Sequence, residues 1–287
     1  MDTDTARTLN EVLTSIIEKN LTVESRKWLF DKTAQALNNN YQLNLTFTSI
    51  PRHTGKKEIE LQEADEKKLQ SLIPRFSVKG WTIDRLCRVW LLGQLESRDG
   101  KAYVSRIENL FPQAEMNELV ALYSSLPILN YSETWKLCCA EGVRSNIGTV
   151  LEAIMYHNPY PANNLDQTAW NQLVLKAFFT DKDVNKIVGL DERTNQNLAN
   201  TLFDYVEERW AAGRTVNPQI WRLTEKYIDE SHFYLFEKLM KEGSETDKKA
   251  GALALSNSSF EKATSLLDQY PQLKTAIEQK KLTWQML

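Results

Sequence analysis

Glycine and proline are scarce in this chain, which has 10 glycines and 8 prolines among its 287 residues. Their scarcity argues against a fold built from many strands and tight turns, and it favours helices. Hydrophobic residues make up 42% of the chain and charged residues 25%. This balance is typical of a globular protein with a core of useful size, and it argues against disorder.

Cysteine is rarer still, with Cys87, Cys138 and Cys139 alone in the sequence. An odd number that includes two neighbours does not indicate a disulfide framework, and it fits a reducing compartment. The amino-terminal stretch MDTDTARTLNEVL is acidic and amphipathic, unlike a signal peptide. No stretch approaches the roughly 18 apolar residues of a membrane span. We therefore expect a soluble, cytoplasmic protein, with the inner face of the membrane as an alternative location.

An excess of positive charge is also lacking, since the net charge is −3. Nucleic-acid binding requires a basic stripe, so no nucleic-acid partner is expected. His53, His157 and His232 are scattered without the spacing of metal ligands. Phosphate-loop, dinucleotide-binding, nucleophile-elbow and zinc-protease motifs do not occur. The sequence thus predicts no metal, no cofactor and no catalytic residue, and it favours a protein that is not an enzyme.

Helical periodicity dominates what is present. Leu9, Val12, Leu13, Ile16 and Ile17 follow the spacing of a one-faced helix, and a second helix is expected over 24–37. Short helices in sequence predict an array of antiparallel helices, either α-solenoid-like (HEAT-like) or an irregular bundle. The further helices are expected at roughly 63–73, 81–95, 101–110, 115–125, 133–157 with a break near Gly142, 166–179, 183–188, 192–212, 218–229, 231–241, 245–256, 258–268 and 271–280.

One segment fits this pattern poorly. In NNNYQLNLTFTSIPRHTGKKEIEL the apolar residues Leu43, Leu45 and Phe47 alternate, which predicts a short strand or extended arm near 41–58. The same segment separates two predicted domains. Residues 1–58 would hold the N-terminal helices with the loop or arm, and residues 59–287 would form the all-α domain.

The helix over 166–179 has an unusual distribution of side chains. One wide stripe is apolar, whereas the opposite side mixes Leu175 and Phe179 with Asn171, Gln172 and Lys176. We expect this helix to be covered on both sides, with Lys176 in a restricted space. The lysine then either reaches solvent or pairs with a carboxylate, or else it meets an anionic or carbonyl group of a ligand.

A second helix, over 192–212, carries Asp204 and Glu208 one turn apart on one face. Two carboxylates at this spacing can hold a metal or supply acid–base chemistry. The simpler interpretation is a helix that is salt-bridged through arginines such as Arg209 or Arg214.

Five blocks in this region carry a family resemblance: CAEGVRSNI, NPYPA, WNQLVLKAFF, GLDER-N and DYVEERWAAGR-V-P-(x2)-W. Together they resemble the EboA family of bacterial metabolite-traffic proteins, strongly from Trp135 to Trp221. Ser145 stands where the family pattern suggests threonine, and Leu173 where it suggests methionine. The resemblance implies an all-α protein encoded beside a prenyltransferase-like membrane protein. That gene cluster is implicated in delivering secondary-metabolite precursors, such as the scytonemin monomer, toward the cell envelope.

The resemblance implies a process and no particular reaction; together with the lack of a nucleophile or metal motif it favours a non-catalytic helical module that takes part in this traffic. It would bind a small metabolite or proteins of the same gene cluster, and peripheral membrane association is left open. The alternative is an enzyme in which Asp204 and Glu208 act as acid and base while Lys176 and Arg144 stabilise charge. The ligand-binding candidates are Arg144, Asn146, Asn171, Lys176, Asp204, Tyr205, Glu208, Arg209 and Trp210.

Overall fold

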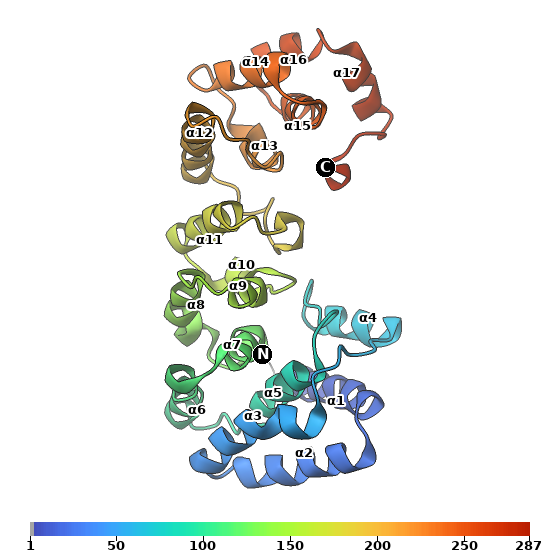
Figure 1. Cartoon of the computed structure of the whole chain (residues 1–287), viewed down its shortest axis with the longest axis vertical. Coiled ribbons are helices and arrows are strands. Elements are labelled where there is room, and N and C mark those ends of the chain that lie inside the picture. The colour runs from blue at the N-terminus through green and yellow to red at the C-terminus, as the bar shows by residue number, and fades with distance from the viewer. Residues whose placement is uncertain (1–2) are drawn as a thin grey trace. The chain divides into compact units, whose positions relative to one another are not determined.

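The protein is an all-α helical array, as the sequence predicts. The computed structural model describes residues 3–287, which contain 17 α-helices and 5 short 3-10 helices and no strand (Figure 1). Two isolated β-bridges, Glu58 with Thr82 and Tyr156 with Ile187, join loop segments in this part of the chain. Both bridges lie next to the site described below.

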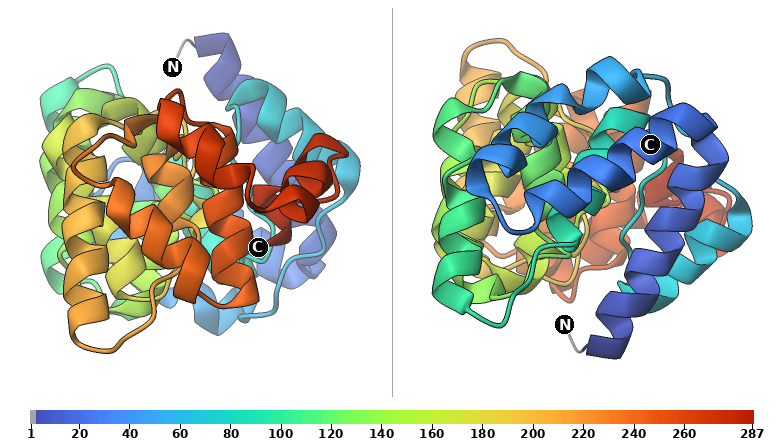
Figure 2. Two further views of the ribbon diagram at one scale, coloured as in Figure 1. Left: turned by 90° about the horizontal axis from the view of Figure 1, so that it is seen from above. Right: turned by 90° about the horizontal axis from the view of Figure 1, so that it is seen from below.

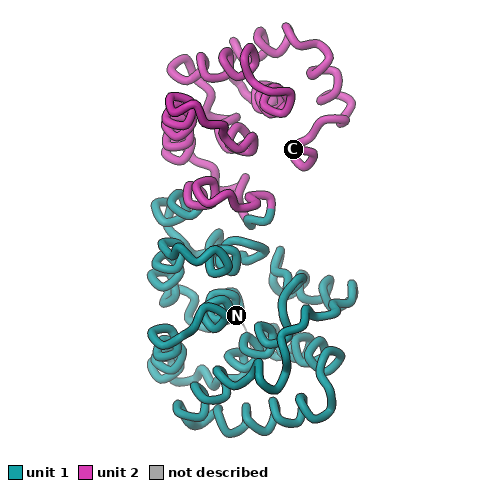
Figure 3. The backbone as a smooth tube through the Cα atoms, viewed as in Figure 1, with its two compact units in different colours: residues 1–173, 186–188 teal, residues 174–185, 189–287 magenta. Residues whose placement is uncertain are grey.

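The chain divides into two compact units (Figure 3). Unit 1 comprises residues 3–173 and 186–188, and unit 2 comprises residues 174–185 and 189–287. The division falls within helix α11 (Gln167–Phe179) and beside the 3-10 helix η3 (Val184–Lys186). A domain boundary after residue 58 stays a prediction.

Unit 1 is organised around helix α5, of which Ile83–Leu92 is buried except for the part-buried Arg85. Helices α1 and α3 pack on α5, α7 packs on α5, and α9 packs on α7 with α8 beside it. The α-helices of unit 1 are α1 (Thr3–Asn20), α2 (Val23–Ala36), α3 (Asn40–Thr54), α4 (Glu63–Leu72), α5 (Ile83–Gly93), α6 (Gly100–Glu108), α7 (Met116–Ser125), α8 (Lys136–Val143), α9 (Gly148–Met155) and α10 (Tyr160–Asn164). Its 3-10 helices are η1 (Phe111–Gln113) and η2 (Ser132–Trp135).

The strand or arm expected near 41–58 is wrong for most of its length, because α3 occupies Asn40–Thr54. Asn39 caps this helix by accepting a hydrogen bond from the backbone N–H of Gln42. Leu43 and Phe47 are four residues apart and buried on one face, while Leu45 points away from the core. The alternation of apolar residues was therefore part of a helical face with one exposed leucine. Figure 2 shows α2 and α3 side by side at one end of unit 1.

Pro51 lies inside α3 and would normally break it. Proline has no N–H, so the carbonyl of Phe47, four residues earlier, lacks its helical donor. The Nε of Arg88 donates to this carbonyl at 2.9 Å and takes the place of the missing N–H. A buried side chain of α5 thus completes a helix that proline alone would interrupt.

The assignment of Asn40–Thr54 to a helix predicts opposite outcomes for Leu43 and Leu45. Leu43→Asp is expected to destabilise the protein by about 3 kcal/mol or more, because Leu43 is 0% exposed and has no partner for a charge there. Leu45→Asp, at 48% exposure, should change the free energy of unfolding by less than about 0.5 kcal/mol. Urea denaturation followed by circular dichroism measures both. Equal losses in the two variants would mean that the segment is not a one-faced helix.

The NPYPA block leads into the short helix α10 (Tyr160–Asn164). Asn158 is buried immediately before it, and its amide satisfies three backbone groups. Nδ2 donates to the carbonyls of Ala153 and Tyr123 at 2.9 and 3.2 Å, and Oδ1 accepts from the N–H of Tyr160 at 3.0 Å. The asparagine therefore fixes the end of α9 to α7 and starts α10.

Local side chains and one glycine set several helix ends. Asp166 precedes α11 and accepts from the N–H of Ala169, and Gly213 follows α12 (Gln196–Ala211) with a left-handed φ of +66°. Ser258 accepts from the N–H of Phe260 in the turn before α16 (Glu261–Leu267), which has no side-chain cap. Before α14 (Phe233–Glu242), the carboxylate of Asp229 accepts from the backbone N–H groups of Ser231 and His232.

Unit 2 is built around helix α15, whose residues Ala250–Leu255 are buried. Small residues let its neighbours approach closely: a Cβ at Gly251 would lie 2.8 Å from side-chain atoms of Leu239 and Met240. Helices α13, α14, α16 and α17 all pack on α15. The remaining helices are α12 (Gln196–Ala211), α13 (Ile220–Thr224), η4 (Glu225–Tyr227), α14 (Phe233–Glu242), α15 (Glu245–Ser256), α16 (Glu261–Leu267), α17 (Pro271–Glu278) and η5 (Trp284–Met286).

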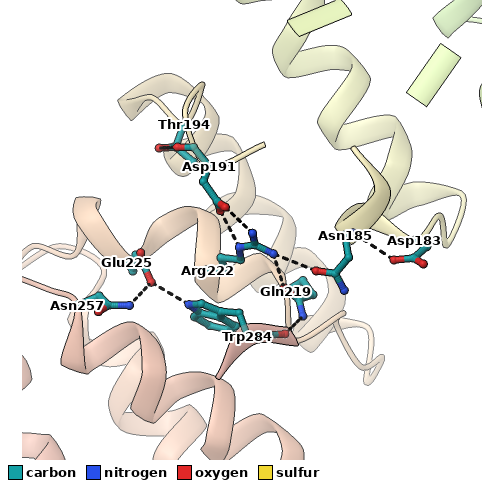
Figure 4. A network of polar contacts seen from close by, with 9 residues as sticks. All are labelled: Asp183, Asn185, Asp191, Thr194, Gln219, Arg222, Glu225, Asn257 and Trp284. Carbon is teal, nitrogen blue, oxygen red and sulfur yellow. Dashed lines mark hydrogen bonds and ion pairs between the residues drawn. The ribbon is translucent and has the colours of Figure 1, made fainter. Parts of the chain in front are cut away.

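A polar network ties the first loop of unit 2 to α13 (Figure 4). Arg222 forms a bidentate pair with the two carboxylate oxygens of Asp191, and its Nη1 donates to Asn185 at 2.9 Å. Asp191 is one of the residues carried over from the family resemblance. Its carboxylate is engaged in a structural ion pair.

The same network holds the C-terminal segment (Figure 4). Trp284 donates from Nε1 to Glu225 at 3.2 Å, and its carbonyl accepts from Gln219 at 2.9 Å. Burial raises the pKa of Glu225, while hydrogen bonds from Asn257 and Trp284 lower it in part. These contacts anchor the end of the chain on α13 and η4.

Candidate functional site

Unit 1 contains a cleft of about 640 Å³, which we call the Arg85 cleft. Its walls come from α4, α5 and the loops around them, from α9 and from η3. They carry both positively and negatively charged side chains. The lining residues are Glu58, Glu66, Gln70, Ser77, Lys79, Gly80, Trp81, Arg85, Glu152, Tyr156, His157 and Lys186.

Main-chain hydrogen bonds between distant segments shape the cleft. The N–H of Ile59 donates to the carbonyl of Trp81 at 2.9 Å, which joins the loop before α4 to the loop before α5. The main chain of His157 likewise joins two other segments of the cleft, the loop before α5 and η3. The carbonyl of His157 accepts from Ser77 at 3.3 Å, and its N–H donates to Lys186 at 2.9 Å.

Two residues of the cleft adopt a left-handed backbone. Gly80 has φ of +75°, which glycine adopts without cost. His157 has φ of +51°, which is unfavourable for a residue with a Cβ. Its two main-chain hydrogen bonds hold it there. Strain of this kind is concentrated at ligand-binding and catalytic sites.

Arg85 is held on two sides by neighbouring side chains of the cleft and the core. Its guanidinium lies over the ring of Trp81, with Cζ 4.1 Å from the ring centroid. Its Nε donates to the hydroxyl of Ser124 at 2.8 Å, and that hydroxyl in turn donates to the carbonyl of Val120. Trp81 is itself packed edge-on against Phe76, with ring centroids 5.8 Å apart. The cation is thus held in one orientation before any ligand arrives.

Burial lowers the pKa of the Arg85 guanidinium to about 9, and the charges of Asp84 and Glu152 act in the opposite direction. The side chain still carries its positive charge at neutral pH. Asp84 is already paired with Arg88 at 2.8 Å in the core. Asp84 is therefore shared between two arginines, and Glu152 is the other carboxylate that acts on Arg85.

The other charged residues of the cleft balance in number. Glu58, Glu66 and Glu152 face the cations Lys79, Arg85 and Lys186. Glu66 accepts a hydrogen bond from the hydroxyl of Ser77 at 2.9 Å, and the Lys186 ammonium lies 5.1 Å from the ring of Tyr156. The lining is therefore amphoteric, with two aromatic rings and one preformed cationic centre.

The residues selected from the sequence lie elsewhere. In unit 1, Arg144 and Asn146 are exposed between α8 and α9, and Asn171 is half-buried on α11. None of the three lines the Arg85 cleft. They and the six candidates of unit 2 belong to different units, so a site that joins them stays a prediction.

In unit 2, Lys176 is half-buried near the end of α11. The stripe from Trp170 to Phe178 is buried as expected, but the expectation of a second covered side is wrong. Phe179 is 58% exposed and forms an edge contact with the Tyr205 ring, with centroids 4.8 Å apart. One aromatic contact is enough to place Phe179 without burying it.

On α12, Asp204 and Glu208 are exposed, whereas Tyr205 is buried. The guanidinium of Arg209 donates to the carbonyl of Thr215 at 3.0 and 2.8 Å and so closes the end of the helix. Trp210 lines a separate cavity of about 390 Å³ in unit 2. The structure thus brings these five together on one helix, and Trp210 lines this cavity.

Sequence reasoning missed the Arg85 cleft because its residues come from five separate segments. A signal was present in GWTIDRLCRVWLL, where three charges interrupt an otherwise apolar helix. Such charges are normally assigned to a solvated face. Here the whole helix is central, so Asp84 and Arg88 are buried and Arg85 is directed to the cleft.

The cysteines are expected to be unreactive in the folded protein. Burial raises the pKa of the Cys138 thiol to about 12 and also raises the pKa of Cys87 and Cys139. Since the thiolate is the reactive form, labelling with Ellman's reagent at pH 8 should be on the order of 100-fold slower than for free cysteine. All three thiols should react at once in guanidinium. Rapid labelling of one thiol in the native protein would contradict this.

Within residues 3–287, no three histidine, cysteine, aspartate or glutamate side chains gather closely enough to hold a metal ion. Among the same residues, no helix combines the length and the apolar character needed to cross a bilayer.

The model of a known family, described as metabolite traffic protein EboA, matches residues 9–225. The chain belongs to the EboA family. The match covers well over half of the chain and includes every residue of the Arg85 cleft. Searches among curated proteins and solved structures give no match. In this EboA family member the cleft therefore lies wholly inside the region that defines the family.

Proposed function

We propose that this EboA family protein is a non-catalytic binding module in metabolite traffic, and that it holds a small metabolite in the Arg85 cleft. The family description supports a role in such traffic. The volume of about 640 Å³ falls within the usual range of roughly 300–1,000 Å³ for small-molecule sites. Delivery of a secondary-metabolite precursor toward the cell envelope, together with proteins of the same gene cluster, is part of this proposal.

The observation that carries the proposal is the bracing of Arg85 by Trp81 and Ser124. A long cationic side chain normally loses much conformational freedom when it binds a ligand. In Arg85 that freedom is already lost, because the Trp81 ring fixes the plane of the guanidinium and the Ser124 hydroxyl fixes the position of its Nε. A preorganised polar group in a cleft is the usual mark of a binding site.

Two observations favour binding over catalysis: the hydrogen bonds of the Ser77 hydroxyl in the cleft, and the exposure of Asp204 and Glu208 on α12. The Ser77 hydroxyl accepts from the N–H of Lys79 at 3.1 Å and donates to Glu66, so it stabilises a turn. A nucleophilic serine needs an open oxygen and a base. Asp204 and Glu208, the acid–base pair of the alternative, are exposed on α12. Exposed carboxylates lack the dry surroundings that tune a general acid.

The test is capture of a metabolite by the purified protein. The protein is incubated with the small-molecule extract of its own host cells, and bound compounds are identified by native mass spectrometry. The wild type and Arg98→Gln, which changes an exposed arginine outside the cleft, should retain the same compound. Arg85→Gln should lose it while keeping the circular dichroism spectrum of the wild type. Equal retention by Arg85→Gln, or none by the wild type, would refute the proposed site.

A further inference from the structure

We infer that the ligand of the Arg85 cleft carries a single carboxylate, which binds the Nη1–Nη2 edge of Arg85 through two parallel hydrogen bonds. This inference rests on the proposed function and names its ligand class. It follows from which donors of Arg85 are already used, from the charges around it, and from the space beside it.

The first step is the count of donors. A guanidinium presents five N–H groups in one plane. In Arg85 one face of this plane is covered by Trp81, and Nε donates to Ser124. Among residues 3–287, this is the hydrogen bond that the structure shows for the group. The four N–H groups on Nη1 and Nη2 remain, and they form the edge that matches the two oxygens of a carboxylate.

The second step is the local charge. Asp84, the first carboxylate that offsets the burial of Arg85, is itself bound to Arg88 at 2.8 Å. Glu152, the second carboxylate that acts on Arg85, lines the cleft with Lys79 and Lys186 as further cations. A ligand anion would add counter-charge at Arg85 itself. This makes an anion a better occupant than a neutral group at the same position.

The third step limits the size of that charge. Glu58, Glu66 and Glu152 line the same cleft and match its three cations. A phosphate monoester carries nearly two negative charges at neutral pH and would meet these carboxylates as well as Arg85. A carboxylate carries one charge, so repulsion is smaller and the planar fit to the guanidinium is kept. The charges therefore select a monocarboxylate over a phosphate.

The fourth step is space. A carboxylate fills only a small part of about 640 Å³. The body of the ligand would lie along the amphoteric remainder of the cleft, where Gln70 and Tyr156 can contact it. The carboxylate thus anchors one end of a larger molecule.

The experiment compares three probes that share one ring: 4-fluorobenzoate, 4-fluorobenzamide and 4-fluorophenyl phosphate. Binding to the full-length protein is measured by fluorine NMR line broadening, which detects millimolar affinities. The benzoate should bind about tenfold or more tightly than the other two, as charge-assisted bidentate pairing requires. Arg85→Gln should abolish the preference, Arg85→Lys should weaken it, and Arg98→Gln, at an exposed arginine outside the cleft, should leave it unchanged.

Each outcome bears on a different claim. Tighter binding of the phosphate or the amide, no binding of the benzoate, or an unchanged preference in Arg85→Gln would overturn the carboxylate assignment. If a host metabolite is nevertheless captured in an Arg85-dependent way, the proposed function stands and only its ligand class is wrong. A thermal melt of each variant separates lost binding from lost folding.

Discussion

Arg88→Met is expected to lower the free energy of unfolding of unit 1 by about 3–5 kcal/mol. Arg88 is 2% exposed and is bound to Asp84 at 2.8 Å, with Glu118 3.8 Å away. Removing it leaves two buried carboxylates without their counter-charge. It also leaves the carbonyl of Phe47 unpaired, because Pro51 cannot donate to it.

Chemical denaturation followed by circular dichroism measures this loss. Arg7→Met is the matched control, because Arg7 pairs with Asp4 in full solvent and should contribute less than about 0.5 kcal/mol. Adding Asp84→Leu and Glu118→Gln to Arg88→Met should recover much of the loss, since no buried carboxylate then remains. If Arg88→Met were as stable as Arg7→Met, the buried charge cluster would have no role in stability.

Asn158→Leu is expected to cost about 3 kcal/mol, because it leaves two carbonyls and one N–H unpaired in the core. Those groups belong to Tyr123, Ala153 and Tyr160. The nearly isosteric Asn158→Asp keeps the acceptor but loses both donors. It should therefore be destabilised as well.

The same block supplies the control. Asn163 is exposed on α10, so Asn163→Ala should shift the free energy of unfolding by less than about 0.5 kcal/mol. Thermal and urea unfolding of the variants provide the comparison. A large loss in Asn163→Ala together with a small one in Asn158→Leu would show that the block does not act through the Asn158 amide.

Local patterns were sufficient for most of the fold. The stripe from Leu9 to Ile17 is buried, and helices such as α4 and α15 begin where expected. The exception, α3, contains a proline and an exposed leucine, both of which weaken a helical pattern. Its stability depends on Arg88, which is 41 residues away from Phe47 in the sequence. Only tertiary structure shows such a contact.

The candidate site was less predictable. A wheel drawn for one helix shows which residues share a face, but it does not show what faces them. Lys176 and Phe179 were expected under cover, and Phe179 is exposed. Arg85 was not singled out from the sequence, and it is braced in a cleft. Both outcomes arise because burial depends on neighbours that are distant in sequence.

The family resemblance was more robust than the residue choices that came with it. It rested on blocks between 135 and 221, and the family match extends over 9–225. Two of those blocks contain residues with clear structural roles, Asn158 and Asp191. Residues shared within a family thus include those that maintain the fold, and they need not mark the ligand.

The hydrogen bond from His157 to Lys186 has a consequence for synthesis of the protein. Most helices of unit 1 contact near neighbours and can form as the chain leaves the ribosome. The cleft cannot be completed then, because Lys186 follows residues 174–185, which already belong to unit 2. A nascent chain arrested before Lys186 would hold the helices of unit 1 with one wall of the cleft missing. The ability to hold cargo would therefore arise only after translation has entered the second unit.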